Sequence, residues 1–473
     1  MAHIVTISVD GGEIRQIEVD IRQEGWEQRM VESLEDIRRE IVGAVLARED
    51  AALAREVPAG WVNLGRECRQ VVTLAGKVVL VRRVFRDEEG QRRKPLDEAL
   101  GLSRYRRDTS GLLRFLAYWA SGVSYRRAAE LSSWAIGEHI TCMRVQRAVW
   151  EVGRALLCQE EAQRAAVFAR GKAPSEGQIG ADIVYCEADG VWLSLQREAM
   201  RGAEVRVAVL YSGKQAISAS RYCLENRITV TRLGCSSQEW QETLLLEVFR
   251  HFSLDQIKTL VLSGDGAPWV RHSLDRLERP VIYQLDRFHL FRAARQTSPA
   301  AVPLARTACQ TGWDGVKDAL QDLIVASPDQ DRHRLLNFQR YLHNNASGLL
   351  DYRLRLGLDS RRYRGLGAIE GNVDKLVVQR MKGRGMSWRL PGARAMLAVC
   401  RHRDALQAQS LPLGGYGYRR TPRLPGRPPR RRPAPREETW LHASVPLLHS
   451  QAENSPLGQA LRHAVNGYPG LSA

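Results

Sequence analysis

The feature that most constrains the fold is the order of hydrophobic patterns between residues 180 and 290. Three segments with strand character come first, IVYCEADGVWLSLQ, EVRVAVLYSG and RYCLENRITVTRL, and we expect them to form successive antiparallel strands. The segment SQEWQETLLLEVFRHF then has a helical pattern, with Ser236 or Ser237 as its N-cap. TLVLSGDG and PVIYQLD are apolar runs that indicate more deeply buried strands. This order predicts an α/β domain.

The same order of strands and helices is that of an RNase H-like core. A mainly helical stretch at about residues 290–360 interrupts it, and we interpret this stretch as an insertion before the last core helix. The core domain then spans residues 176–409, preceded by an N-terminal region at 1–105 and a helical region at 106–175. The basic, Pro-rich segment at residues 410–473 has the composition of a disordered tail.

The N-terminal region combines a long helix with a β-hairpin. The segment VVTLAGKVVLVRRVF predicts the hairpin, with its turn near Ala75-Gly76. Spacings of three and four residues predict an amphipathic helix over residues 26–56. The residues on its apolar face are Trp26, Met30, Leu34, Ile37, Ile41 and Val45.

A second helical pattern resembles a helix-turn-helix unit. Its first helix runs from Tyr125 to about Trp134, its turn lies near Ile136-Gly137, and its second helix begins at about Ile140. Simple packing of a helical hairpin is the alternative interpretation. Basic residues favour contact with DNA, namely Arg126, Arg127, Arg144 and Arg147.

The chain carries a formal net charge of +17, which makes nucleic acid the first partner to consider and an acidic membrane surface the second. No run approaches the roughly 20 apolar residues of a membrane span, and Asp10 and Glu13 stand where a signal peptide needs an apolar segment.

The eight cysteines form no CxxC pair or zinc-like cluster, so we expect reduced thiols in the cytoplasm. Fingerprints of P-loop, GxSxG, HExxH and dinucleotide-binding proteins are absent.

Three acidic residues occupy positions that suit a metal-dependent nucleic-acid enzyme. Asp189 lies within the first predicted strand of the core, Asp265 ends a later buried strand, and Glu370 begins a helix-like stretch. Mg²⁺ takes oxygen ligands and shares them with substrate phosphates, so three carboxylates can serve two divalent ions. The pattern predicts a site for two Mg²⁺ or Mn²⁺ ions at these three residues.

Two of the acids also have a purely structural interpretation. Asp189 can be a strand-end residue beside a tight turn, and Glu370 can compensate the positive end of a helix dipole. Glu370 falls at the edge of the apolar stripe of its helix, and Asp374, one turn later, is an alternative ligand.

Other residues near the acids have a possible role in the same chemistry. Asp286 and His289 follow the strand VIYQL. They can form a supporting pair next to the metal site, or they can be a helix cap and a core histidine. The segment after Glu370 can hold phosphates and stack on a base, and a solvated helix face with a buried Trp is the alternative. The residues concerned are Lys375, Arg380, Lys382, Arg384 and Trp388.

The motifs EADGVW, SGDGAPW, LDRFHL and GAIEGNVDKLVVQRMKGRGMSW occur in this order and resemble the ISLre-type family of bacterial insertion-sequence transposases. That family is similar to the Mutator-like DDE superfamily, in which a C/D-x-x-H motif follows the second Asp. Here this motif falls on Asp286 and His289. The resemblance extends to about residue 400 and implies an RNase H-like catalytic domain with a DDE triad at Asp189, Asp265 and Glu370. The basic end after that point departs from the family pattern.

The resemblance implies a DDE transposase that cuts element ends and joins the resulting 3′-OH to target DNA by two-metal phosphoryl transfer. The implied partners are element-end and target DNA, with the chain as a homo-oligomer on DNA and no membrane partner. An RNase H-like nuclease without strand transfer is one alternative. A catalytically inactive DNA-binding protein derived from a transposase is the other.

Overall fold

The structure, a computed structural model, describes residues 3–9, 12–19, 22–174, 177–218, 221–383 and 385–408, with only the backbone for the first two ranges. All of them belong to one compact unit, Met1–Gly417. The predictions made for Arg384 and for the tail at 410–473 lie outside the described residues. Within the part of the chain described, none of the helices combines the length and apolar character needed to cross a bilayer.

The described part of the N-terminal region contains one long and one short helix and two small antiparallel sheets. Its elements are β1 (His3–Val9), β2 (Gly12–Val19), α1 (Trp26–Glu56), β3 (Val62–Thr73), β4 (Gly76–Arg86), β5 (Arg92–Arg93) and α2 (Pro95–Ala99). Strands β3 and β4 form the predicted hairpin, in which Thr73 pairs with Gly76. Gly76 has a φ of +94°, a left-handed conformation that glycine adopts without strain.

Helix α1 has the predicted bounds, but it buries only part of the predicted face: Ile37 is buried at 3% exposure. Leu34 and Val45 are 44% and 55% exposed. The helix packs on β4 through Val42, Leu46 and Leu53 instead. Asp50 lies on this same face, and it is buried because it accepts hydrogen bonds from the backbone and side chain of Arg83. Because a polar residue interrupts this buried face, the spacing of hydrophobic residues in the sequence did not indicate it.

The next region is helical, with α3 (Ser110–Gly122), α4 (Tyr125–Ile136) and α5 (Cys142–Phe168). Each helix begins with a hydroxyl cap, because the side chains of Thr109, Ser124 and Thr141 accept from backbone N–H groups in the first turn. Gly137, at φ +65°, ends α4. The structure thus contains the helical hairpin that the sequence predicted.

The central sheet has five strands in the order β10-β7-β6-β11-β12. Strands β6, β7 and β10 pair antiparallel, while β11 and β12 run parallel to β6. The elements of this part are β6 (Ile183–Ser194), β7 (Gly202–Tyr211), β8 (Gly213–Ala216), β9 (Tyr222–Glu225), β10 (Ile228–Leu233), α6 (Ser237–His251), η1 (Leu254–Gln256), β11 (Thr259–Gly264), α7 (Pro268–Arg271) and β12 (Val281–Leu285). The protein is therefore a mixed α/β protein with a mixed sheet.

One predicted strand is divided in the structure. The segment RYCLENRITVTRL forms both β9 and β10, and Asn226 separates them with a φ of +51°. Asn is among the few residues that adopt this left-handed conformation readily. Strand β9 pairs with β8 in a separate hairpin, so only β10 joins the central sheet.

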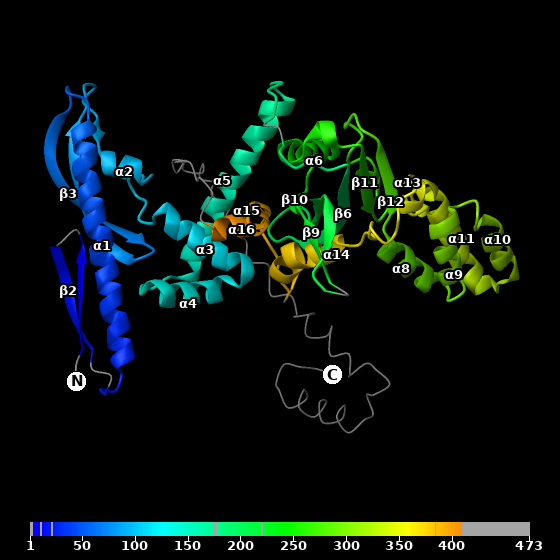
Figure 1. Cartoon of the computed structure of the whole chain (residues 1–473), viewed down its shortest axis with the longest axis horizontal. Coiled ribbons are helices and arrows are strands. Elements are labelled where there is room, and N and C mark those ends of the chain that lie inside the picture. Colours follow the sequence, from blue (N-terminus) through cyan, green and yellow to red (C-terminus); the bar gives the residue numbers. More distant parts are fainter. Residues whose placement is uncertain are drawn as a thin grey trace, which may run out of the picture. The chain divides into compact units, whose positions relative to one another are not determined.

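The two faces of the sheet are covered by different helices (Figure 1). Helix α6 packs Leu244 and Val248 against Cys186 and Ala188 of β6. The apolar cluster on the opposite face includes residues of α3, α4 and α5, but the sheet itself contacts the C-terminal helices. Those helices are α14 (Ile369–Val373), the π-helix η2 (Asp374–Lys382), α15 (Leu390–Arg401) and α16 (Arg403–Gln407).

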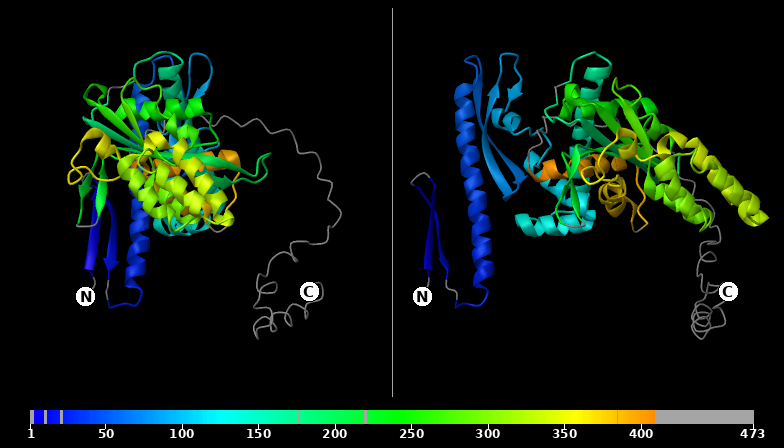
Figure 2. Two further views of the ribbon diagram at one scale, coloured as in Figure 1. Left: turned by 90° about the vertical axis from the view of Figure 1, so that its right-hand side faces the viewer. Right: turned by 45° about the vertical axis from the view of Figure 1, so that its right-hand side comes forward.

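The stretch at about 290–360 is helical, as predicted, and builds a core of its own (Figure 2). Leu285 at the end of β12 belongs to this apolar cluster and links it to the sheet. The helices are α8 (Arg287–Thr297), α9 (Ala301–Thr311), α10 (Lys317–Ala326), α11 (Asp329–Asn344), α12 (Ala346–Leu349) and α13 (Tyr352–Leu356).

A buried ion network joins α5, α6 and α15. Arg401 contacts Glu160 and Glu247 at 2.7 Å each. Burial alone would raise the pKa of both carboxyls, but neighbouring cations outweigh it, and the pKa of Glu247 falls to about 2. A carboxyl whose pKa is lower in the folded state stabilises the fold above its unfolded pKa, and this contribution is lost as pH falls.

We therefore expect the free energy of unfolding to decrease between about pH 4.5 and pH 2 as Glu247 takes up a proton. Urea unfolding followed by tryptophan fluorescence from pH 6 downward measures this. Glu247→Gln should be less stable at pH 6 and should lose less stability on acidification. Parallel pH curves for the two proteins would contradict this assignment.

Candidate functional site

Asp189 and Asp265 lie side by side at the centre of the sheet. Strand β11 pairs parallel with β6, with Ser263 opposite Glu187. Continuing this register by two residues brings Asp265 level with Asp189. Side chains alternate along a strand, so both acids belong to the face that also carries Glu187.

Asp286 extends the same row on the next strand. Gly264 pairs with Leu285 of β12, and the backbone N–H of Asp286 donates to the Gly264 carbonyl at 2.8 Å. One residue further along this register, Asp265 is level with Asp286. The parallel strands β6, β11 and β12 thus present one acid each in a single row, here called the acidic row: Asp189, Asp265 and Asp286.

A glycine keeps the middle of the acidic row closely packed. A Cβ at Gly264 would lie 2.6 Å from the carbonyl oxygen of Ala188 and 2.5 Å from Cγ1 of Val270. Any larger residue would therefore separate β11 from β6 next to the acids. Asp265 then uses one carboxylate oxygen to accept from the N–H of Ala267 at 2.9 Å.

The members of the acidic row affect one another electrostatically. Burial raises the pKa of Asp189; His289 opposes this, while Asp265 and Asp286 raise it further. The hydrogen bond with Asp286 raises the pKa of His289 against the effect of burial, and Asp189 raises it further. A cation bound here would relieve the repulsion between the carboxylates.

Asp286 differs from the other two acids because both of its oxygens have partners, whereas Asp189 and Asp265 each accept one backbone hydrogen bond on Oδ1. It is buried, and it caps α8 by accepting from the N–H groups of Phe288 and His289. It also bonds Nδ1 of His289 at 2.8 Å. Asp286 therefore fixes the imidazole beside Asp189, which leaves Asp189 and Asp265 as the more available oxygen ligands.

Glu370 is on α14, which packs against β6 and β7, but its side chain is exposed. Val373, Val377 and Met381 are buried as the predicted stripe requires. Across the described part of the chain, no group of three or more His, Cys, Asp or Glu side chains is arranged to hold a metal ion. The structure brings Asp189, Asp265, Asp286 and His289 together, and Glu370 is held on a neighbouring element.

Glu187 is an important residue that sequence analysis did not identify. It is fully buried on β6, and its Oε2 accepts from the first N–H groups of the turn into α14, those of Gly367 (2.8 Å), Ala368 (2.7 Å) and Ile369 (3.2 Å). Its Oε1 accepts from the hydroxyl of Tyr211 at 2.6 Å. Glu187 therefore ties the helix that carries Glu370 to the strand that carries Asp189.

The residues predicted to bind DNA lie in different environments. Arg380 is buried, where its guanidinium lies over the rings of Tyr125 and Trp388 and donates to a backbone carbonyl. Trp388 donates from Nε1 to the Met381 carbonyl and packs with the core. Arg144 is paired with Asp108. The exposed members of the set are Arg126, Arg127, Arg147, Lys375 and Lys382.

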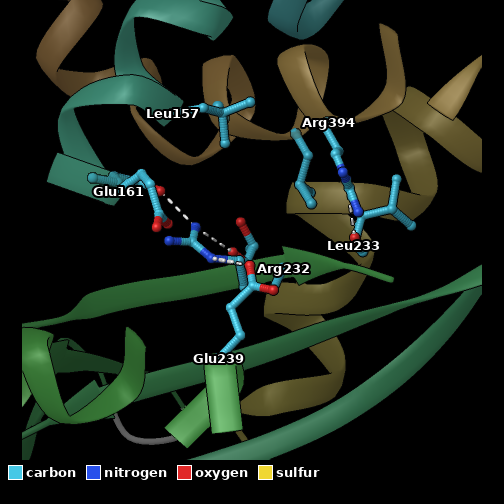
Figure 3. A pocket seen from close by; sticks show the side chains of 10 residues that line it. Leu157, Glu161, Arg232, Leu233, Glu239 and Arg394 are labelled. Atoms are coloured by element: carbon cyan, nitrogen blue, oxygen red, sulfur yellow. Dashed lines mark hydrogen bonds and ion pairs between the residues drawn. The ribbon is translucent and has the colours of Figure 1, made fainter. Parts of the chain in front are cut away.

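A separate cavity of about 190 Å³ lies between α5, β10 and α15 (Figure 3). Arg232 occupies it and pairs with Glu160 at 2.5 Å and Glu239 at 3.6 Å. Arg394, on the opposite wall, donates to the Leu233 carbonyl at 3.3 Å. Both arginines are thus engaged with groups of the protein itself, so we assign the cavity a structural role.

The fold and the site define a mixed α/β protein with a row of acids on three parallel strands. The chain matches the model of an uncharacterised protein family, UPF0236, over residues 5–406, and it belongs to this family. A UPF0236 protein of Caldanaerobacter subterraneus subsp. tengcongensis is 21% identical over 376 residues, 78% of this chain and 75% of the relative. A UPF0236 protein in the vanSb 3′ region of Streptococcus gallolyticus is 23% identical over 383 residues, 79% of this chain and 81% of the relative.

Proposed function

We propose that the protein is a DDE transposase with an RNase H-like core. The observation that carries the proposal is the level placement of Asp189 and Asp265 on adjacent parallel strands, beside a helix that bears Glu370. The sheet order adds to it, because three antiparallel strands followed by two parallel ones, with a helix between the two sets, is the expected order of this core.

The oxygen donors fit hard divalent cations in chemistry. Asp189 and Asp265 would hold Mg²⁺ or Mn²⁺, and Glu370 would complete the site from α14. Divalent ions bound there would lower the pKa of a water molecule and stabilise both oxygens of an in-line displacement. Glu187 keeps α14 against β6, and Asp286 keeps the His289 ring beside Asp189, so the chain's own contacts preserve the arrangement of the acids.

A surface for the DNA backbone is available on the helical region. Arg126 and Arg127 of α4 and Arg147 of α5 are exposed, and Trp134 on α4 is 85% exposed. Exposed cations supply phosphate affinity, and an exposed aromatic ring can pack against a base or sugar. Arg127 forms an exposed surface ion pair with Glu130 at 2.9 Å, whereas the side chains of Arg144 and Arg380 are engaged within the protein, so we assign DNA contact to the exposed residues.

The names of the relatives agree with a mobile element. The name of the relative from Caldanaerobacter subterraneus carries eleven locus designations. A sequence present at many loci is what repeated transposition leaves in a genome. This observation favours a transposase over a nuclease that cuts without joining.

The test is an assay with labelled duplexes that represent the DNA flanking the gene. With Mn²⁺ or Mg²⁺, a transposase should yield cleaved 3′ ends and then longer joined products with a target plasmid. A nuclease would yield only the cleaved strands, and an inactive DNA-binding protein would shift the mobility of the duplex without any product. Either of these last two results would reject the transposase.

Deletion of residues 411–473 should weaken nonspecific DNA binding and leave the thermal melting temperature nearly unchanged. The segment is rich in Arg and Pro. For each DNA phosphate that the deletion protein no longer neutralises, the magnitude of the slope of log K against log salt concentration should decrease by roughly 0.9 on duplex DNA. Fluorescence anisotropy at several salt concentrations gives the slope. An unaltered slope, or a deletion protein that does not fold, would contradict the assignment of the tail.

A further inference from the structure

A second pocket, of about 480 Å³, opens where β6 begins. Its floor contains the rings of Tyr185 and Tyr211, which stack with centroids 5.0 Å apart and an interplanar angle of 16°. The volume lies within the range of sites that enclose small organic ligands. The side chains of greatest interest in its walls are Lys214, Arg362, Tyr363 and Arg364.

The wall with the two arginines is a loop fixed at several points along its backbone. The Tyr352 hydroxyl donates to the Arg364 carbonyl, and Lys214 Nζ donates to the Gly365 carbonyl, each at 2.6 Å. Two residues later, the N–H of Gly367 reaches the Glu187 carboxylate. The backbone of the loop is thus held on the sheet, and the loop leads directly into α14.

The side chains of this loop remain available to a ligand. Arg362 and Arg364 are exposed, and in the described part of the chain neither forms an ion pair with an acid. Their guanidinium groups lie over aromatic rings, 5.6 Å from the centroid of Tyr363 and 5.0 Å from that of Tyr222. A guanidinium fork matches the oxygens of a phosphate, and an aromatic face accepts any base.

The charge of the pocket favours an anion. Lys214 is paired with Glu187 at 3.9 Å, so the cations left for a ligand are Arg362 and Arg364, and the carboxylates in the lining are those of Asp182 and Glu225. Of these carboxylates, Asp182 already pairs with a lysine at 3.0 Å. A ligand with one phosphate and one flat ring would therefore meet complementary groups on both parts.

We propose that this pocket binds one nucleotide unit of a DNA strand, with its phosphate at Arg362 and Arg364 and its base on Tyr363. The proposal rests on the transposase function and adds to it a binding subsite for the strand. Tyr185 and Asp189 are on the same face of β6, four residues or about 13 Å apart, and Glu187 between them is buried beneath the turn into α14, so a strand that reaches both the pocket and the acidic row has to pass around this turn.

The binding test uses single-stranded oligo(dT) with a fluorescent label, measured by anisotropy in the absence of divalent ions. The double substitution Arg362→Ala and Arg364→Ala should weaken binding by about tenfold or more. Arg361→Ala is the matched control, because Arg361 is exposed in the same loop but does not line the pocket. Loss of this one charge, which lies away from the proposed phosphate site, should change the affinity for the oligonucleotide by less than about twofold. If the double variant melts at a lower temperature, Arg362→Gln and Arg364→Gln replace it.

A second pair of variants tests the base contact. Tyr363→Ala should weaken binding several-fold, and Tyr363→Phe should restore it because it keeps the ring. Equal affinity for all these variants and the wild type would overturn the proposal. So would competition by free dTMP as strong as that by the oligonucleotide, since the pocket would then serve a free nucleotide.

The outcomes for the pocket and for the transposase are distinguishable. If the pocket variants bind normally while Asp189→Asn abolishes cleavage, the pocket proposal fails and the transposase stands. If the wild type neither cuts nor joins DNA while the pocket variants lose oligonucleotide binding, the transposase fails and the nucleotide pocket remains.

Discussion

Asp189→Asn and Asp265→Asn should each lower Mg²⁺-dependent cleavage of element-end DNA by on the order of a thousandfold and leave DNA affinity almost unchanged. The amide keeps the shape of the carboxylate and loses the negative charge that holds a cation. DNA affinity depends mainly on Lys and Arg, which both variants retain. Cleavage rates on a labelled duplex and anisotropy with the same duplex measure the two properties.

The matched control for these variants is Asp275→Asn. Asp275 lies between β11 and β12, is exposed, and contacts His272 at 2.7 Å on the surface. This substitution removes the same charge outside the acidic row, so cleavage should stay close to the wild-type rate. Substantial cleavage by Asp189→Asn or Asp265→Asn would show that the acidic row is not catalytic.

Glu187→Ala should have the largest effect on stability among the residues near the site, lowering the free energy of unfolding by about 3 kcal/mol or more. The substitution leaves the hydroxyl of Tyr211 and three backbone N–H groups without their acceptor inside the protein. It also releases the start of α14, so cleavage should fall in the fraction that remains folded. Urea unfolding and cleavage rates give the two values.

Glu187→Gln tests how the contribution of Glu187 to stability is related to its positioning of α14. The amide oxygen can still accept from the N–H groups of α14, so we expect a smaller loss of stability than with Ala. If Glu187 positions α14, cleavage should recover with Gln in parallel with stability. If the urea concentration at the midpoint of unfolding is the same for Glu187→Ala and the wild type, then Glu187 does not hold α14 to β6.

Sequence patterns predicted the elements best where burial follows a simple period. Helix α1 ends where Pro58 and Gly60 require, and the stripe of Val373, Val377 and Met381 is buried as expected. The prediction failed where a polar residue sits inside a buried face, as Asp50 does in α1. It also failed where one residue changes the direction of the chain, as Asn226 does between β9 and β10.

The candidate site could be predicted only in part, because strand register is a property of the folded sheet. Sequence order indicated Asp189 and Asp265, but the level placement of Asp286 depends on pairings that the sequence does not specify. Glu187 had one detectable signal, since an acid two positions before Asp189 shares its face of the strand. The loop at 361–364, RRYR, had another, with three cations around a tyrosine shortly before Glu370.

The two alternative functions remain distinct in chemical terms. A nuclease would use the same acids and would need no contact with a target strand. An inactive DNA-binding protein would need the basic surfaces and not the acids, so substitutions in the acidic row would leave it unaffected.

The most direct test is a crystal structure of the protein with element-end DNA and Mn²⁺, with the ions located from their anomalous signal. The account predicts ions between the carboxylates of Asp189 and Asp265, at roughly the 2.0–2.2 Å distances of metal–oxygen bonds, with Glu370 as a further ligand. Such a map would also show a phosphate of the strand beside the ions. Ions bound elsewhere, with Asp189 and Asp265 free of metal in a complex that cuts its DNA, would contradict it.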